Sequence, residues 1–271
     1  MKQKRLDMLP ISRMPYSEKR RIGFVLTDID DTLTNNGRLT ADAYSALEQL
    51  HSAGKKIIPV TGRPAGWCDH IARMWPVDAL VGENGAFYFS YDHSQKKMIR
   101  RYWKSSEQRA RDNLRLKAVE QEILSQVPGA GVAADQAYRE ADLAIDFCED
   151  VPPLAGEQIA RIVQCFEKAG AMAKISSIHV NGWFGEYDKL AMTRTLFQEK
   201  YSLNLNQVKE RVLYIGDSPN DAPMFAFFKN SVGVANVQAF IDDIETLPTW
   251  VTLGEGGHGF AEMAAALLDD Q

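Results

Sequence analysis

Three short apolar runs, each followed by polar residues, constrain the fold of this 271-residue chain most strongly. The runs cover residues 22–26, 57–60 and 212–215. Apolar runs of this length, bounded by polar residues, are typical of buried parallel strands. Because ligands bind at the carboxyl ends of such strands, we expect the polar residues that follow the three runs to form a site.

Segments with helical spacing alternate with the predicted strands. Thr40 is suited to cap a helix that carries apolar residues at helical spacing and ends at Gly54. Further helices are predicted at residues 68–74, 189–201 and 260–268, and further strands at 79–81, 231–234 and 250–252. This alternation predicts an α/β fold whose core is a Rossmann-like, doubly wound parallel sheet.

The pattern changes between residues 89 and 182, where strands are grouped with two long helices. The strands are predicted at 86–91, 98–102, 143–147, 171–175 and 178–181, and the helices at 109–127 and from Pro152 to about 169. Such a group indicates a separate α+β unit inserted into the core. We therefore predict a discontinuous catalytic core of residues 22–88 and 183–271, with a cap domain at 89–182.

Residues 1–21 are rich in basic side chains, and we expect them to form a solvated tail, with an acidic partner as the alternative. The apolar run of a secretory signal or a membrane span is not found. The net charge of −5 lacks the basic excess of a nucleic-acid groove, and the three cysteines fit reduced thiols. These features predict a cytoplasmic protein that binds no nucleic acid and no membrane. We expect a small-molecule substrate as the partner and a monomer or homodimer as the assembly.

The polar residues after the first and third runs are carboxylates, which suits a site for phosphoryl transfer. Such a reaction needs positive charge near the transferred group, and carboxylates supply it by holding a divalent cation. Mg²⁺ typically binds one or two protein carboxylates and keeps several waters. Asp28 and Asp217 are placed as ligands, and Asp221 can support the same ion. We therefore expect Mg²⁺ as the cofactor.

The remaining polar residues divide the chemistry between them. Asp28 stays ionised and can attack phosphorus, whereas Asp30 can protonate the leaving group and later deprotonate water. Thr61, Gly62 and Lys189 can bind the phosphoryl oxygens. Each cluster alone is also a common polar turn, so the prediction depends on their joint placement after parallel strands.

Four segments in this order resemble the motifs of the haloacid dehalogenase superfamily. They are Asp28-Ile29-Asp30-Asp31-Thr32-Leu33, Thr61-Gly62-Arg63-Pro64, Lys189 and Gly216-Asp217-Ser218-Pro219-Asn220-Asp221. The second aspartate of the first segment is typical of the phosphatase branch, and the position of the insert is typical of the α/β-capped subgroup. The one visible departure is Asp31, which stands where glycine is usual.

The resemblance implies a role for each of these residues. Asp28 would be nucleophile and metal ligand, and Asp30 the general acid and base as well as a main-chain metal ligand. Asp217 and Asp221 would complete the metal site, and Asn220 would help to fix the phosphate site. Substrate contacts are implied for four further residues, namely Asn84, Ser177, His179 and Asn181. For His179 and Asn181, an ordinary surface or packing role is the alternative.

The function implied is that of a magnesium-dependent phosphomonoester hydrolase with an aspartyl-phosphate intermediate. The substrate would be a small phosphorylated sugar or sugar derivative, because residues 216–224 and 179–181 are similar to those of sucrose-phosphate and mannosyl-3-phosphoglycerate phosphatases. Two alternatives stay open. One is a phosphosugar mutase of the same superfamily, and the other is a regulator that binds sugar phosphates without turnover.

Overall fold

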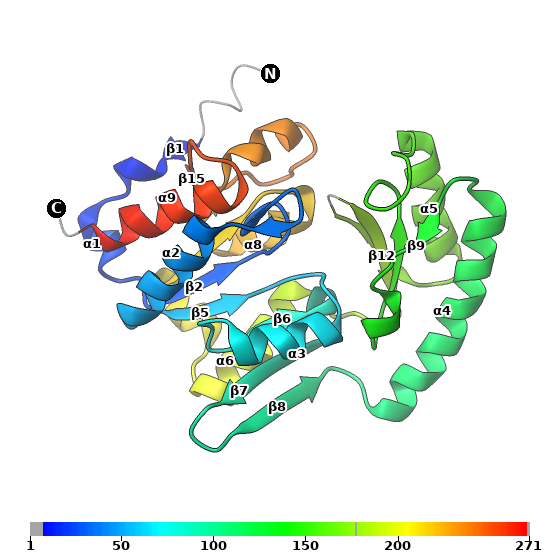
Figure 1. The fold of residues 1–271 in the computed structure, drawn as a ribbon, viewed down its shortest axis with the longest axis horizontal. Helices are drawn as coiled ribbons and strands as arrows, with labels where there is room; N and C mark the ends of the chain where they lie inside the picture. Colours follow the sequence, from blue (N-terminus) through cyan, green and yellow to red (C-terminus); the bar gives the residue numbers. More distant parts are fainter. Residues whose placement is uncertain (1–7, 177, 270–271) are drawn as a thin grey trace.

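The computed structural model describes residues 8–176 and 178–269. Its central sheet has six parallel strands in the order β1-β15-β14-β13-β2-β5 (Figure 1). From one edge to the other these strands are β1 (Leu9–Pro10), β15 (Trp250–Val251), β14 (Asn230–Gly233), β13 (Val212–Gly216), β2 (Phe24–Thr27) and β5 (Lys56–Pro59). The predicted α/β class with a parallel sheet is confirmed.

Both faces of this sheet are covered by helices, so its central strands are apolar on both sides. In β2, Val25 joins the cluster on one face, whereas Phe24 and Leu26 join the cluster on the other. The first face carries α2 (Ala41–Ser52), α3 (Ala65–Met74) and α9 (Gly256–Leu268). The second carries α6 (Lys189–Tyr201), α7 (Leu205–Val208) and α8 (Ala222–Phe227). This is the doubly wound arrangement that the sequence predicts.

An antiparallel unit extends the sheet beyond β5. It consists of β6 (Leu80–Gly82), β7 (Phe87–Asp92) and β8 (Lys97–Tyr102), and a parallel bridge between Val60 and Val81 joins it to the core. The sequence analysis assigned residues from 89 onward to the insert. The hairpin of β7 and β8 instead packs with the core, because Phe87 and Phe89 join the core cluster.

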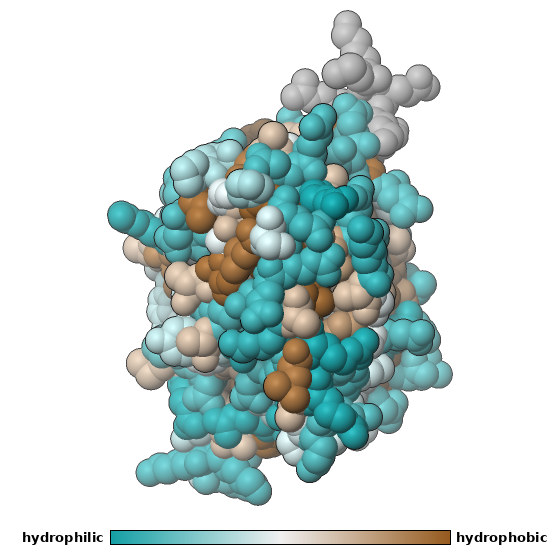
Figure 2. All heavy atoms as spheres, turned by 90° about the vertical axis from the view of Figure 1, so that its right-hand side faces the viewer, coloured by the Kyte–Doolittle hydropathy of each residue, from teal (hydrophilic) through white to brown (hydrophobic). Residues whose placement is uncertain are grey.

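The inserted block has a sheet and an apolar core of its own (Figure 1). Its sheet order is β11-β12-β10-β9. The strands are β9 (Gly131–Val132), β10 (Leu143–Asp146), β11 (Met172–Ile175) and β12 (His179–Trp183), and the helices are α4 (Ser106–Gln126) and α5 (Gly156–Lys168). The helices pack on the sheet face that is turned away from the core, which leaves the opposite face toward it. Figure 2 shows that the outer side of this block is largely hydrophilic, with apolar side chains scattered among polar ones.

Residues 8–21 correct part of one prediction. The sequence analysis treated residues 1–21 as a solvated tail, but β1 pairs with β15, and Ile11 and Met14 are buried in the core cluster. The tail ahead of residue 8 lies outside the described residues. Residues 8–21 therefore pack on the core despite their basic side chains, because the few apolar residues between the charges are sufficient to bury this segment.

Short elements complete the chain. They are η2 (Ile11–Arg13), α1 (Tyr16–Lys19), β3 (Thr34–Asn35), β4 (Arg38–Leu39), η3 (Glu83–Gly85), η4 (Gln136–Tyr138), η5 (Lys209–Arg211), η6 (Pro219–Asp221) and η7 (Ala235–Phe240). Within the described part of the chain, every helix is too short or too polar to cross a membrane.

Candidate active site

Two neighbouring strands bring the first pair of carboxylates together. In the sheet, β2 lies beside β13 with Thr27 aligned to Ile215, and each strand ends within two residues of an aspartate. The backbone N–H of Asp28 donates to the Ile215 carbonyl at 2.9 Å, which extends the pairing by one residue. Asp28 and Asp217 therefore lie side by side at the carboxyl edge, as the sequence predicts.

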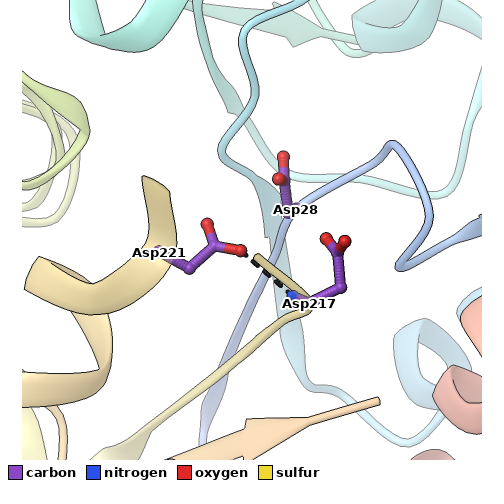
Figure 3. A group of neighbouring side chains, drawn as sticks. All are labelled: Asp28, Asp217 and Asp221. Carbon is purple, nitrogen blue, oxygen red and sulfur yellow. Dashed lines mark hydrogen bonds between the residues drawn. The ribbon is translucent and has the colours of Figure 1, made fainter. Parts of the chain in front are cut away.

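Asp221 completes a group of three buried carboxylates (Figure 3). One oxygen from each of Asp28, Asp217 and Asp221 lies within 4.8 Å of the others. The Asp221 carboxylate is held by the turn, because it accepts from the backbone N–H groups of Asp217 at 3.1 Å and Ser218 at 3.3 Å. A Cβ atom at Gly216 would come within 2.4 Å of the same carboxylate, so this close approach requires glycine.

The electrostatics of this group suit a hard cation. Burial raises the pKa of Asp28 to about 7, although Lys189 acts against this, and Asp221 adds to the increase. Burial, followed by Asp221 and Asp28, also raises the pKa of Asp217. Three buried carboxylates that repel one another, each offering oxygen, are the donor set that Mg²⁺ prefers. The residues therefore fit the predicted ion.

Lys189 lies at the start of α6 and reaches the same group. Its Nζ is 3.2 Å from Asp28 Oδ2 and 3.0 Å from Asp221 Oδ1. The preceding Asp188 caps the helix, because its side chain accepts from the Ala191 N–H at 2.7 Å. Although burial alone would lower the pKa of Lys189, Asp221 and Asp28 raise it, so the ammonium keeps its charge.

Two residues that the sequence analysis missed hold the carboxylates in place. The Thr32 hydroxyl donates to Asp217 Oδ1 at 3.0 Å, and both side chains are buried. The Tyr214 hydroxyl donates to Asp221 Oδ1 from the middle of β13. Thr32 belongs to a recognised segment and could have been proposed, but a tyrosine within an apolar strand gives no such signal.

Asp30 is held by an arginine from the second segment. Arg63 donates to Asp30 Oδ1 through Nε at 2.9 Å and through its terminal nitrogen at 2.7 Å. The same guanidinium lies 3.4 Å from Asp135 and 3.3 Å from Glu149, both in the inserted block. It also lies over the Trp67 ring, 4.4 Å from the centroid. The sequence analysis did not name Arg63 as a site residue, because its partners are far away in the chain.

The loop after β5 carries the predicted phosphate-binding residues. The Thr61 hydroxyl is buried and accepts from the Arg63 N–H at 3.0 Å. Gly62 lines a cavity that also contains Asp28. A Cβ atom at Gly62 would lie 3.2 Å from the amide of Asn84, so glycine allows these two segments to approach closely.

The inserted block supplies residues to the same cavity. Asp28, Asp30 and Asn220 line it from the core, and His179 and Asn181 line it from β12. The cavity therefore lies between the core and the insert. Its lining brings predicted catalytic and predicted substrate residues together, although nothing in the geometry assigns their roles.

The residues from β12 are supported within the insert. His179 Nε2 lies 2.9 Å from Glu149 Oε2, and the Asn181 amide donates to Asp142 Oδ2 at 3.1 Å. These contacts fix both side chains toward the cavity. The fourth predicted substrate residue, Ser177, lies outside the described residues.

A buried network at the junction of core and insert was not foreseen. Glu83 accepts from the backbone N–H groups of the insert, including Ala141 at 2.6 Å. Burial and then Asp142 raise the pKa of Glu83 to about 8. Arg139 donates to Asp142 at 3.0 Å and to the Gly62 carbonyl at 2.9 Å, and its charge acts to lower the pKa of Glu83. The network ties the insert to the loop that carries Thr61 and Gly62.

Asp31, at the usual glycine position, has a conformational explanation. Its φ of 54° lies in the left-handed region, which glycine adopts easily and aspartate tolerates better than most residues. Its N–H donates to the Thr34 hydroxyl at 3.1 Å, and its carbonyl accepts from Asn236 at 2.6 Å. The turn of the first segment is therefore kept despite the substitution.

Comparisons with known proteins agree with this geometry. Residues 25–116 match the family described as haloacid dehalogenase-like hydrolase. A sequence search of curated proteins found no match.

Solved structures share the whole architecture. A Thermoplasma acidophilum protein is 19% identical over 91% of this chain and 98% of its own, with a TM-score of 0.68. A haloacid dehalogenase-like hydrolase from Bacteroides thetaiotaomicron is 16% identical over 91% of this chain and 100% of its own, with a TM-score of 0.63. The sucrose phosphatase of Synechocystis sp. is 15% identical over 90% of this chain and 97% of its own, with a TM-score of 0.62. At such identities the likeness establishes the fold, and the predicted resemblance to this superfamily is confirmed.

Proposed function

We propose that this chain is a haloacid dehalogenase-like hydrolase, and that it acts as a magnesium-dependent phosphatase that forms an aspartyl-phosphate on Asp28. The observation that carries the proposal is the position of the Asp28 carboxylate. It lies 3.2 Å from the ammonium of Lys189 and within 4.8 Å of the carboxylates of Asp217 and Asp221, at the carboxyl edge of a parallel sheet. A nucleophilic carboxylate needs both a cation to bind the phosphoryl group and a rigid position, and this site offers both.

The metal site would be formed by Asp28 and Asp217, with Asp221 in support and the main chain of Asp30 as a further ligand. Bound Mg²⁺ supplies positive charge that neutralises the phosphoryl oxygens. Thr32 and Tyr214 keep the carboxylates oriented by hydrogen bonds, as supporting residues do at metal sites.

The chain's own residues carry the covalent steps. One oxygen of Asp28 attacks phosphorus, and the bond between phosphorus and the ester oxygen breaks. The amide of Gly62, the hydroxyl of Thr61 and the ammonium of Lys189 stabilise the negative charge on the phosphoryl oxygens, with Asn220 helping to fix the phosphate site. The products of this step are an aspartyl-phosphate and the free leaving group.

Asp30 handles the proton in both halves of the reaction. It protonates the departing ester oxygen, and it then takes a proton from the water that attacks the aspartyl-phosphate. Phosphate leaves, and Asp28 is regenerated. Arg63 orients Asp30 and connects it to Glu149 and Asp135, so closure of the insert would position the acid.

We further propose that the substrate is a small phosphorylated sugar or sugar derivative. The insert covers the site and offers side chains that can bind hydroxyl groups, chiefly His179 and Asn181. The structural similarity to a sucrose phosphatase supports this choice. We expect the enzyme to act in the cytoplasm, as a monomer or homodimer.

The test is release of free phosphate from p-nitrophenyl phosphate and a panel of sugar phosphates, phosphoglycerates and nucleotides, with Mg²⁺ or with chelator. Asp28→Asn should fold normally and lose turnover, because an amide does not attack phosphorus. The exposed Asp243→Asn serves as the matched control and should keep full activity. Turnover by Asp28→Asn near the wild-type rate would refute the nucleophile. Isomerisation without phosphate release would instead identify a mutase.

A further inference from the structure

A second cavity lies beside the phosphoryl site, on the side of α6. Its lining includes the polar residues Asn84, Lys189 and Asn220. Its walls are largely apolar and include Trp183 and Met224. Because Asn220 lines both cavities, this space adjoins the place where the phosphoryl group is expected to bind.

Asn84 leaves a hydrogen-bond donor unused in this cavity. The residue is only 5% exposed, and its Nδ2 has no partner among residues 8–176 and 178–269. A buried amide donor without a partner costs free energy, so its retention at a cavity wall indicates a ligand acceptor.

The backbone around Asn84 is strained. Glu83, Asn84 and Gly85 have φ values of 41°, 54° and 108°, all in the region that favours glycine. A Cβ atom at Gly85 would lie 2.1 Å from the Asp188 carbonyl, so the turn is pressed against the start of α6. Strain of this kind persists where the surrounding structure enforces it, often at binding sites.

A second donor faces the cavity from the insert. Lys174 lies on β11 opposite Asn181 of β12, and its side chain is exposed. In the described part of the chain its ammonium pairs with no carboxylate, unlike Arg63 and Arg139, whose charges are met by acidic partners. Lys174 is therefore a cation available to a ligand.

Two acidic residues also line this cavity, and they bear on the sign of its charge. Asp188 is engaged at the helix cap, where it accepts from the Ala191 N–H. Glu186 lies exposed in the turn ahead of α6. Asp188 is therefore already occupied by a hydrogen bond within the protein, whereas Glu186 is the acid of this lining that is open to solvent.

We propose that this cavity binds a carboxylate on the leaving group, so that the substrate is a phosphorylated hydroxy acid or sugar acid. Asn84 would donate to one carboxylate oxygen and Lys174 would balance its charge, while Trp183 and Met224 contact the carbon chain. The inference rests on the proposed phosphatase function and narrows its substrate.

Matched esters that differ only in the acid group provide the test. With saturating Mg²⁺, kcat/KM is compared for 3-phosphoglycerate against glycerol 3-phosphate, and for 6-phosphogluconate against glucitol 6-phosphate. For at least one pair, kcat/KM of the acid should exceed that of the neutral ester by about tenfold, because a hydrogen bond to a charged group contributes about this much to binding. Equal or faster turnover of both neutral esters overturns the inference. A still higher value for fructose 1,6-bisphosphate would assign the cavity to a second phosphate and also overturns it.

Variants separate this inference from the proposed function. Lys174→Ala should reduce the acid-to-neutral ratio of kcat/KM by about tenfold, whereas Lys168→Ala, an exposed lysine on α5, should leave the ratio unchanged. Asn84→Gly tolerates the positive φ, removes the donor and should raise KM for the acid more than for the neutral ester.

Glu186→Gln should strengthen binding of the acid, because it removes a negative charge from the rim. Weaker binding in this variant would indicate a cationic ligand and refute the inference. If p-nitrophenyl phosphate is also not hydrolysed by the wild type, the phosphatase proposal itself fails. Turnover of that ester with no effect of Lys174→Ala on the ratio refutes only the carboxylate.

Discussion

Replacing Thr32 by valine tests whether the hydrogen bond to Asp217 organises the metal site. Valine has nearly the same shape but lacks the hydroxyl that donates to Asp217 Oδ1 at 3.0 Å. Both residues are almost fully buried, so water cannot replace the lost donor. A hydrogen bond to a charged group contributes about 1.5–3 kcal/mol. Burial raises the pKa of Asp217, and the hydrogen bond from Thr32 acts to lower it. Loss of this bond therefore also favours the protonated form of Asp217, which binds Mg²⁺ less well.

The expected result is a rise in the dissociation constant for Mg²⁺ of roughly tenfold to a hundredfold. It is measured by titrating Mg²⁺ calorimetrically and by the metal dependence of p-nitrophenyl phosphate turnover. Thr32→Ser retains the hydroxyl and should bind Mg²⁺ nearly as well as the wild type. If folded Thr32→Val bound Mg²⁺ with unchanged affinity, the assignment of Asp217 as a ligand oriented by Thr32 would be wrong.

Three further predictions concern stability. Tyr214→Phe removes the hydroxyl that donates to Asp221 and should lower the free energy of unfolding by about 1–3 kcal/mol, as measured by urea titration. An unchanged free energy of unfolding would mean that the hydroxyl does not stabilise this carboxylate. Gly182→Ala places a Cβ atom within 2.0 Å of the Phe166 ring, so it should overpack the insert and lower the thermal midpoint of unfolding. Gly156→Ala is the control, because a Cβ atom there meets open space and should leave the midpoint unchanged. Without metal, folding raises the pKa of Asp28 from 3.8 to about 7. Between these two pH values the folded state holds a proton that the unfolded state has lost. The free energy of unfolding should therefore fall as the pH rises from about 4 to about 7. Mg²⁺ binds the ionised carboxylate, so it should raise the thermal midpoint more at pH 8 than at about pH 5.5; equal increases would contradict the assignment.

The parallel core was predictable because its strands are buried on both faces. Such strands read as unbroken apolar runs, and the chain order of runs and helices then limits the topology. Errors lie where local signals were overlooked. Helix α4 begins at Ser106 rather than Arg109, because Ser105 and Gln108 form a capping box. The turn between β3 and β4 is an Asn36-Gly37 pair, a recognised hairpin signal.

The extent of the insert was harder to infer, because hairpin β7–β8 could have packed on either unit. Only the tertiary contacts of Phe87 and Phe89 decide that it joins the core. Residues 8–21 show the same limitation, since Ile11 and Met14 are too few to give a periodic pattern. Neither case has a local signal strong enough to determine the packing.

The site shows the same division between local and long-range information. The segments that carry Asp28 and Asp217 lie at strand ends, where topology brings them together. Contacts between core and insert depend on long-range geometry, such as Arg63 with Glu149, which are 86 residues apart. Short motifs are therefore enough to propose the chemistry, whereas the residues proposed to position the acid and select the substrate are found only in the structure.

The proposed mechanism requires Asp28 to carry the phosphoryl group during turnover. The most direct measurement is to mix the Mg²⁺-loaded enzyme with a radiolabelled phosphate ester, quench in acid within one turnover, and map the labelled peptide. Label is expected on the peptide that contains Asp28, and none in Asp28→Asn. Label on another residue, or continued turnover by Asp28→Asn with no labelled protein, would contradict it.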